Sequence, residues 1–127
     1  MKSNEVSGGT LAYLGDAVWS LLIREYLIEK GYARPDDLQK ISVKYVSAKA
    51  QAEIFTRLLE KSFFKEDEID IYKRGRNYKS GSVPKNTDVQ IYRVATGFEA
   101  ILGYWHLEGK EERLGQLWEK VKTFMEV

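Results

Sequence analysis

The sequence predicts an all-α, single-domain protein, and three observations support this fold class. Apolar residues recur at intervals of three and four along almost the whole chain, which is the period of an amphipathic helix. No stretch alternates between apolar and polar residues as a half-buried strand does, and no internal repeat is present. The chain has 127 residues, 43% of them hydrophobic, which is enough for one core and one domain over residues 1–127.

The first two helices are predicted from the signals at their ends. Ser7 or Thr10 is suited to cap a helix that runs to about Lys30, and Gly31 follows as a stop. Pro35 opens the second helix, because proline is favoured in a first helical turn. The two aspartates that follow it lie near the positive end of the helix dipole.

Four further helices are expected, at residues 48–61, 65–77, 88–107 and 110–127. Ser47 is suited to cap the first of them, and Gly109 separates the last two. Residues 79–87 contain glycine, serine and proline and form the one clear loop. His106, the only histidine, is expected to pack among its aromatic neighbours.

The composition excludes several classes of protein. There is no cysteine, which excludes disulfides and thiolate metal sites and fits an intracellular protein. The first ten residues lack the apolar core of a signal peptide. The apolar stretch Val6–Ile23 contains Asp16 and a pair of glycines, which argues against a membrane-spanning helix. A soluble cytoplasmic protein is therefore expected.

Two acidic residues stand alone in apolar surroundings. Asp16 is the only charged residue in Val6–Ile23, and Glu99 is the only one between Arg93 and Glu108 when histidine is counted as neutral. Burying an isolated carboxylate is costly unless a cation or a hydrogen-bond donor compensates it. Each acid therefore either has a partner within the protein or faces a cleft and holds something.

Small residues surround both acids and indicate that the two helices pack closely. They are Gly15, Ala17, Gly97, Ala100 and Gly103. Close packing would bring the acids together, and two converging carboxylates without a fixed counter-charge suit a hard cation such as Mg²⁺ or Mn²⁺. On spacing alone, an alternative is equally open, in which each acid is half-exposed or bonded to a hydroxyl or a base in the core.

Two stretches concentrate positive charge and indicate a polyanion partner. Residues 71–87 contain five bases and no acid, and residues 38–52 also contain no acid. The candidate RNA-binding residues are Lys49, Lys73, Arg74, Arg76, Lys79, Ser80, Ser82, Lys85 and Asn86. A solvated helix end with a mobile loop would explain the bases alone. Their combination with a carboxylate metal site favours phosphodiester hydrolysis.

Three motifs resemble those of a known family. The segments "LAYLGDAVW" and "FEAILGYWHL" look like the two acidic motifs of ribonuclease III catalytic domains. The segment "KRGRNYKSGSVPKNTD" between them, with no double-stranded-RNA-binding domain in this sequence, is similar to the Mini-III subfamily.

The resemblance implies an all-helical ribonuclease III fold and a homodimer that cleaves double-stranded RNA with Mg²⁺, for which Mn²⁺ can substitute. It also implies 5′-phosphate and 3′-hydroxyl ends and maturation of the 23S ribosomal RNA precursor. Ribosomal proteins or the pre-ribosome are then possible partners. The small residues listed above would allow the close helix packing of a dimer, which supplies one active site for each strand.

Residue by residue, Asp16 and Glu99 match the catalytic, metal-binding acids of the family. Full-length relatives usually have two further acids, at the positions of Ala12 and Thr96 here. Two readings from other functional classes therefore remain open. One is an inactive RNA-binding or ribosome-assembly helical dimer, and the other is a helical dimer whose lone acids are structural.

Overall fold

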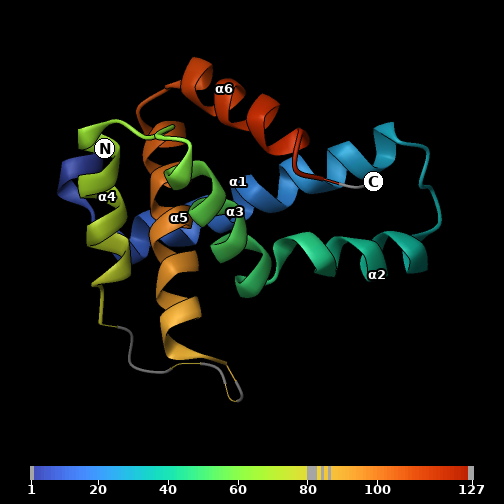
Figure 1. Cartoon of the computed structure of the whole chain (residues 1–127), viewed down its shortest axis with the longest axis horizontal. Helices are drawn as coiled ribbons and strands as arrows, with labels where there is room; N and C mark the ends of the chain where they lie inside the picture. Colours follow the sequence, from blue (N-terminus) through green and yellow to red (C-terminus); the bar gives the residue numbers. More distant parts are fainter. Residues whose placement is uncertain (1, 80–82, 84, 86, 126–127) are drawn as a thin grey trace.

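In the computed structural model, residues 2–79, 83, 85 and 87–125 are described, and they form a helical bundle (Figure 1). No strand occurs among these residues, so the all-α prediction is confirmed. The elements in order are η1 (Ser3–Glu5), α1 (Gly8–Glu29), α2 (Pro35–Val46), α3 (Ala48–Glu60), α4 (Glu66–Arg76), α5 (Val89–Leu107) and α6 (Glu111–Lys122).

The end signals read from the sequence act as predicted. The Ser7 hydroxyl caps α1 by accepting a hydrogen bond from the Thr10 N–H at 3.1 Å. Gly31 follows the helix with a φ of 99°, a conformation that glycine adopts without strain. The Ser47 hydroxyl caps α3 in the same way as Ser7 caps α1. The final helix is shorter than predicted, because α6 ends at Lys122.

The helices α1 and α5 cross at the centre of the molecule, and glycines allow their backbones to touch (Figure 1). A Cβ atom on Gly15 would collide with the Glu99 carbonyl oxygen, and one on Gly103 would collide with that of Leu11. The close approach predicted from the small residues is therefore confirmed here.

The helix α4 packs on α5 through a second set of small residues. A Cβ atom on Gly75 would lie 2.6 Å from the Cβ of Ala100, and Gly97 lies against the Tyr72 ring. These contacts are within one chain, so they lend no support to the dimer packing for which the small residues were also expected to serve. Ala17 is exposed and takes no part in them.

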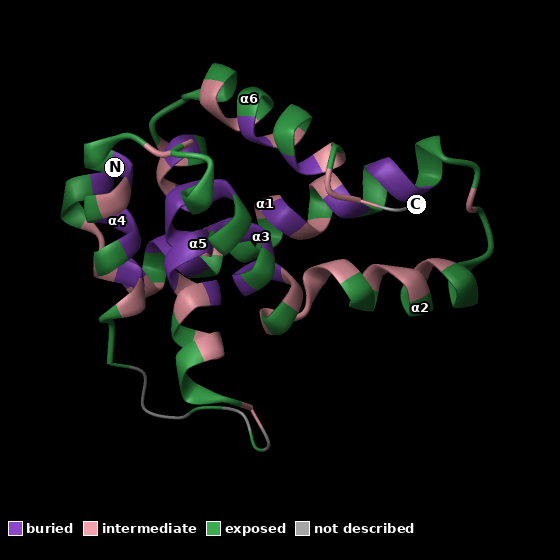
Figure 2. Cartoon of the chain, viewed as in Figure 1, coloured by how far each residue is buried: buried purple, intermediate pink, exposed green. Residues whose placement is uncertain are grey.

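The core lies around α5, and α1, α3, α4 and α6 contribute buried side chains to it (Figure 2). Trp19, Phe98 and Trp105 are fully buried, and the Trp19 and Phe98 rings meet edge to face at 5.4 Å. The expectation for His106 is wrong, because it is exposed on the last turn of α5. No helix in the described part of the chain is long and apolar enough to cross a membrane.

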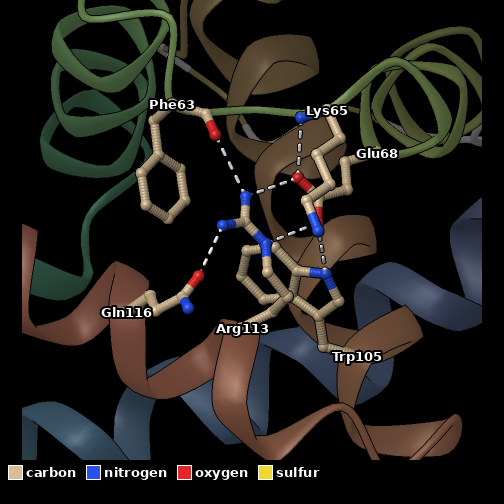
Figure 3. Close-up of polar contacts among 6 residues, drawn as sticks. All are labelled: Phe63, Lys65, Glu68, Trp105, Arg113 and Gln116. Carbon is tan, nitrogen blue, oxygen red and sulfur yellow. Dashed lines mark hydrogen bonds and ion pairs between the residues drawn. The ribbon is translucent and has the colours of Figure 1, made fainter.

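A buried ion pair ties α4, α5 and α6 together (Figure 3). The Glu68 carboxylate accepts hydrogen bonds from Arg113 Nη2 at 2.7 Å, from Trp105 Nε1 at 3.1 Å and from the Lys65 N–H at 2.8 Å. Arg113 also donates to the Phe63 carbonyl oxygen. Burial raises the pKa of Glu68, but these hydrogen bonds and the charge of Arg113 outweigh burial and hold the pKa below its usual value.

Candidate active site

A cleft of about 480 Å³ lies where α1, α3, α4 and α5 meet, and it contains both lone acids. Asp16 comes from α1 and Glu99 from α5. The cleft is also lined by Ala12, Tyr13, Gln51, Arg76, Arg93 and Thr96. The predicted convergence of the two acids is therefore observed, at the crossing of the two central helices.

The helix crossing explains why the acids meet. Gly15 lies against the backbone of Glu99, so the next residue of α1, Asp16, is brought beside the Glu99 side chain. A residue with a Cβ at position 15 would push the two helices apart. The glycine therefore serves the geometry of the acid pair as well as the packing of the bundle.

Within the described part of the chain, the two acids have no cationic partner. The only ion pairs among the described residues are Arg113–Glu68 and Lys122–Glu119, and neither lies at the cleft. Burial raises the pKa of Glu99. A hydrogen bond to Asp16 and the negative charge of Asp16 raise this pKa further. A hydrogen bond from Gln51 acts in the opposite direction, and the resulting pKa is about 9.

At neutral pH and without a cation, Glu99 therefore retains a proton between two carboxyl groups. A divalent cation can take the place of that proton, because metal ligands must be deprotonated to bind. Asp16 is exposed to solvent and Glu99 is half-buried, so the pair is open to an ion from one side. The arrangement has the chemistry of a hard-cation site.

A cation held by the two acids would need further ligands other than carboxylates. The positions that are acidic in full-length relatives, Ala12 and Thr96, line the cleft but supply no charge. In the part of the chain that the structure describes, no group of three or more His, Cys, Asp or Glu residues is placed to hold a metal. Water and the hydroxyl and amide oxygens of the cleft are the other oxygen ligands available.

Gln51 is a site residue that the sequence reasoning missed. It is 2% exposed, lines the cleft and donates from Nε2 to Glu99 Oε2 at 3.2 Å. Its Oε1 is buried and has no hydrogen-bond partner in the described structure. A signal was available, because Gln51 shares the buried face of α3 with Phe55 and Leu58, a face on which a polar residue is unexpected.

The predicted bases do not form one cluster at the cleft. Arg76 lines it and is half-buried, and Arg93, which was not predicted, lines it too. Lys73, Lys79 and Lys85 are exposed.

Lys49 is also exposed, but it borders a separate groove between α3 and α5. Ser80, Ser82 and Asn86 lie outside the described residues.

Arg74 differs from the other predicted bases. It is half-buried, and its guanidinium donates to the backbone carbonyl oxygens of Ser3 and Val6. The side chain therefore fastens the N-terminal segment to α4. Neither Arg74 nor Arg76 forms an ion pair with Asp16 or Glu99, so neither base neutralises the acids.

Comparison with known proteins identifies the family. The model of the ribonuclease III domain matches residues 9–110, a range that includes both acids. The Mini-ribonuclease 3 of Staphylococcus aureus is 47% identical over 116 residues, which is 91% of this chain and 87% of that protein. The Mini-ribonuclease 3 of Streptococcus pneumoniae is 49% identical over 114 residues, which is 90% of this chain and 89% of that protein.

The fold is also shared with a solved structure. The crystal structure of protein FN1578 from Fusobacterium nucleatum has a TM-score of 0.84 and 35% identity to this chain. The match covers 97% of this chain and 98% of that protein. The chain therefore belongs to the ribonuclease III family of endoribonucleases, in its Mini-ribonuclease 3 branch.

Proposed function

We propose that this protein hydrolyses phosphodiester bonds in double-stranded RNA, using Mg²⁺, or Mn²⁺ in its place, held by Asp16 and Glu99. One observation carries the proposal: two carboxylates without a cationic partner converge in a cleft of a ribonuclease III domain. The Gln51 oxygen without a partner at the same place fits a hydrated cation, which brings O–H donors with it.

Different residues of the chain have different roles in the proposed hydrolysis. When bound, the cation supplies positive charge that lowers the pKa of a water molecule and stabilises the leaving oxygen. Asp16 and Glu99 hold the cation at the crossing of α1 and α5, and the cationic side chains of Arg76 and Arg93 bind phosphates along the cleft. Water attacks phosphorus and the 3′ oxygen leaves, which gives a 5′-phosphate and a 3′-hydroxyl end.

The RNA duplex is proposed to extend from the cleft along α4 and the segment that follows it. Lys73, Lys79 and Lys85 are exposed there, and none of them forms an ion pair with an acid in the described part of the chain. Lys49, Ser80, Ser82 and Asn86 belong to the same proposal on sequence grounds. Arg74 contributes indirectly, because its hydrogen bonds hold the N-terminal segment against α4.

A homodimer is proposed to form on an exposed apolar stripe of α1. Tyr13 is 84% exposed, Leu21 58% and Ile28 60%, and Ala17 lies between the first two at helical spacing. Tyr13 also lines the cleft, so a partner on this stripe would place a second active site near the first. Light scattering should give a dimer mass at micromolar concentration, and a monomer mass with full activity would contradict the dimer.

The substrate within the cell is proposed to be the precursor of 23S ribosomal RNA in the cytoplasm. The support is the family membership together with the motif resemblance, which implies this substrate and contact with ribosomal proteins or the pre-ribosome.

A cleavage assay on duplex RNA tests the activity. Wild-type protein should cut with Mg²⁺ and should not cut with EDTA, and Asp16→Asn should bind RNA without cutting it. RNA binding without cleavage by the wild-type protein in Mg²⁺ and in Mn²⁺ would instead favour the inactive RNA-binding alternative. A salt-dependent binding assay then separates that alternative from a protein whose acids are purely structural.

A further inference from the structure

The amide of Gln51 has a fixed orientation. Its Nε2 donates to the Val46 carbonyl oxygen at 2.9 Å as well as to Glu99 Oε2 at 3.2 Å. A carbonyl oxygen can only accept a hydrogen bond, so the nitrogen of the amide has to face Val46. The two hydrogen bonds therefore determine which end of the amide is oxygen.

That orientation leaves an acceptor without a donor. Gln51 Oε1 is buried and has no hydrogen-bond partner in the described structure. Buried polar atoms are paired in the great majority of native structures, and an exception requires an explanation. A purely structural glutamine would not account for it, because methionine would fill the same volume in α3 without an unpaired oxygen.

The location of Gln51 supplies the explanation. The residue lines the cleft together with Asp16 and Glu99, and its nitrogen already holds one Glu99 oxygen. Metal-binding side chains are commonly oriented by a second residue that hydrogen-bonds to them. A hydrated cation between the two acids would also bring water O–H groups to the wall that Gln51 forms.

We propose that Gln51 is a positioning residue of the cation site. Its Nε2 orients Glu99 toward the cation, and its Oε1 accepts a hydrogen bond from a water molecule bound to the cation. This inference rests on the proposed cation site of Asp16 and Glu99. In this proposal, the Gln51 amide takes over part of the role that two further acids have in full-length relatives, where this chain has Ala12 and Thr96.

Two substitutions and one control test the proposal. Gln51→Met removes the donor and the acceptor and keeps an unbranched side chain of similar size. Gln51→Glu keeps an acceptor and adds negative charge. Thr56→Val is the matched control on α3, because its hydroxyl bonds to the Ala52 carbonyl oxygen of the same helix and lies outside the cleft.

The first measurement is the affinity of the RNA-free protein for Mn²⁺. The paramagnetic resonance signal of the free ion reports how much Mn²⁺ is unbound. Gln51→Met should weaken binding by about 10-fold or more, the usual effect of losing such a partner. Gln51→Glu should bind Mn²⁺ at least as tightly as the wild type. Binding by Gln51→Met equal to that of the wild type and Thr56→Val would overturn the proposal.

Cleavage over a range of Mg²⁺ concentrations is the second measurement. Gln51→Met should need about 10-fold more Mg²⁺ for half-maximal rate and should recover most of its rate at saturation. A rate lowered equally at every Mg²⁺ concentration would indicate a structural role and overturn the proposal. If Gln51→Met does not fold, Mn²⁺ should still raise the Tm of Gln51→Glu at least as much as that of the wild type, and a smaller rise would overturn the proposal.

The failure of this inference is distinguishable from that of the proposed function. If the wild-type protein cleaves RNA with Mg²⁺ and Gln51→Met behaves identically, only the proposed role of Gln51 is overturned. If the wild-type protein binds Mn²⁺ tightly but cuts no RNA, the proposed nuclease function is overturned. In that case a weaker Mn²⁺ affinity of Gln51→Met would still support the positioning role.

Discussion

Glu68 is buried and Glu99 is half-buried in the same bundle, and their surroundings differ in kind. Glu68 has a guanidinium partner, an indole N–H and a backbone N–H, and its pKa is held below the usual value (Figure 3). Glu99 has a second carboxyl group as its neighbour, and its pKa is raised to about 9. The charge of the first acid is satisfied by the protein alone, whereas for the second we propose a cation as the partner.

The difference teaches how a structural acid can be told from a functional one. Removing one partner of a buried ion pair leaves an unpaired charge, so Glu68 is important for the fold. An acid without a counter-charge destabilises the free protein and is therefore a candidate for a functional group. The predictions below test this separation of roles, from the largest expected effect to the smallest.

The strongest test removes the charges of the cation site. Asp16→Asn and Glu99→Gln should each lower single-turnover cleavage of duplex RNA by about 1,000-fold or more, because the cation contributes several kcal/mol to the transition state. The double variant should be hardly slower than either single one, since both groups serve one ion. Losses that multiply would show that the two acids act at separate sites.

The second test removes the structural acid. Glu68→Gln should lower the free energy of unfolding by about 3 kcal/mol, because the half-buried Arg113 loses its counter-charge. Denaturant unfolding measures this, with Asp70→Asn on the exposed side of α4 as the control. The folded Glu68→Gln variant should cleave within a few-fold of the wild-type rate, and a rate loss like that of Glu99→Gln would contradict the separation of roles.

The third test uses pH. The folded pKa of Glu99 is raised, so without divalent cations stability should fall as pH rises from about 4.5 toward about 9, by at most about 1.4 kcal/mol per pH unit. Glu99→Gln should remove this decline. Glu68 has a lowered folded pKa, so its contribution should be present at neutral pH and lost as pH falls below 4.5.

Denaturation in EDTA at a series of pH values measures both effects. Added Mg²⁺ should flatten the decline of the wild-type protein, because the cation replaces the proton on Glu99. A wild-type stability curve that matches that of Glu99→Gln throughout would contradict the raised pKa.

The smallest change in stability is expected when exposed basic residues are replaced. These residues allow structural and functional roles to be compared for positively charged side chains as well. Changing Lys73, Lys79 and Lys85 together to alanine should flatten the salt dependence of RNA binding by roughly two to three units in log–log slope. The free energy of unfolding should change little, since exposed charges contribute little to folding. Arg74→Ala should do the reverse, and a flattened slope for Arg74→Ala alone would contradict its structural assignment.

Much of the local structure was predictable because its causes lie within a few residues. Ser7, Ser47 and Gly31 act at helix ends as their side chains or backbone freedom dictate. The lone acids Asp16 and Glu99 were found for the same reason, since an isolated charge is visible in its own sequence neighbourhood. The roles of both residues in catalysis stay predictions.

The errors came from contacts between distant segments. The sequence does not reveal that Gly15 and Gly103 meet backbone of the same chain, so the small residues were assigned to a dimer as well. His106 lies in an aromatic segment, but the rotation of α5 exposes it. Arg74 and Arg76 are two residues apart on α4 and therefore lie on different sides of the helix, but only the tertiary structure shows that the N-terminal segment meets Arg74 and the cleft meets Arg76.

By itself, the sequence determined the helices, their ends and the two acids that stand alone, because periodicity, caps and charge isolation are properties of short segments. Only the tertiary structure decided what surrounds those acids. The crossing of α1 and α5 pairs them, α3 adds the Gln51 amide, and the cleft takes Arg93 as well. The physical reason is that a charge's environment depends on the groups folded around it, and these come from parts of the chain far apart in sequence.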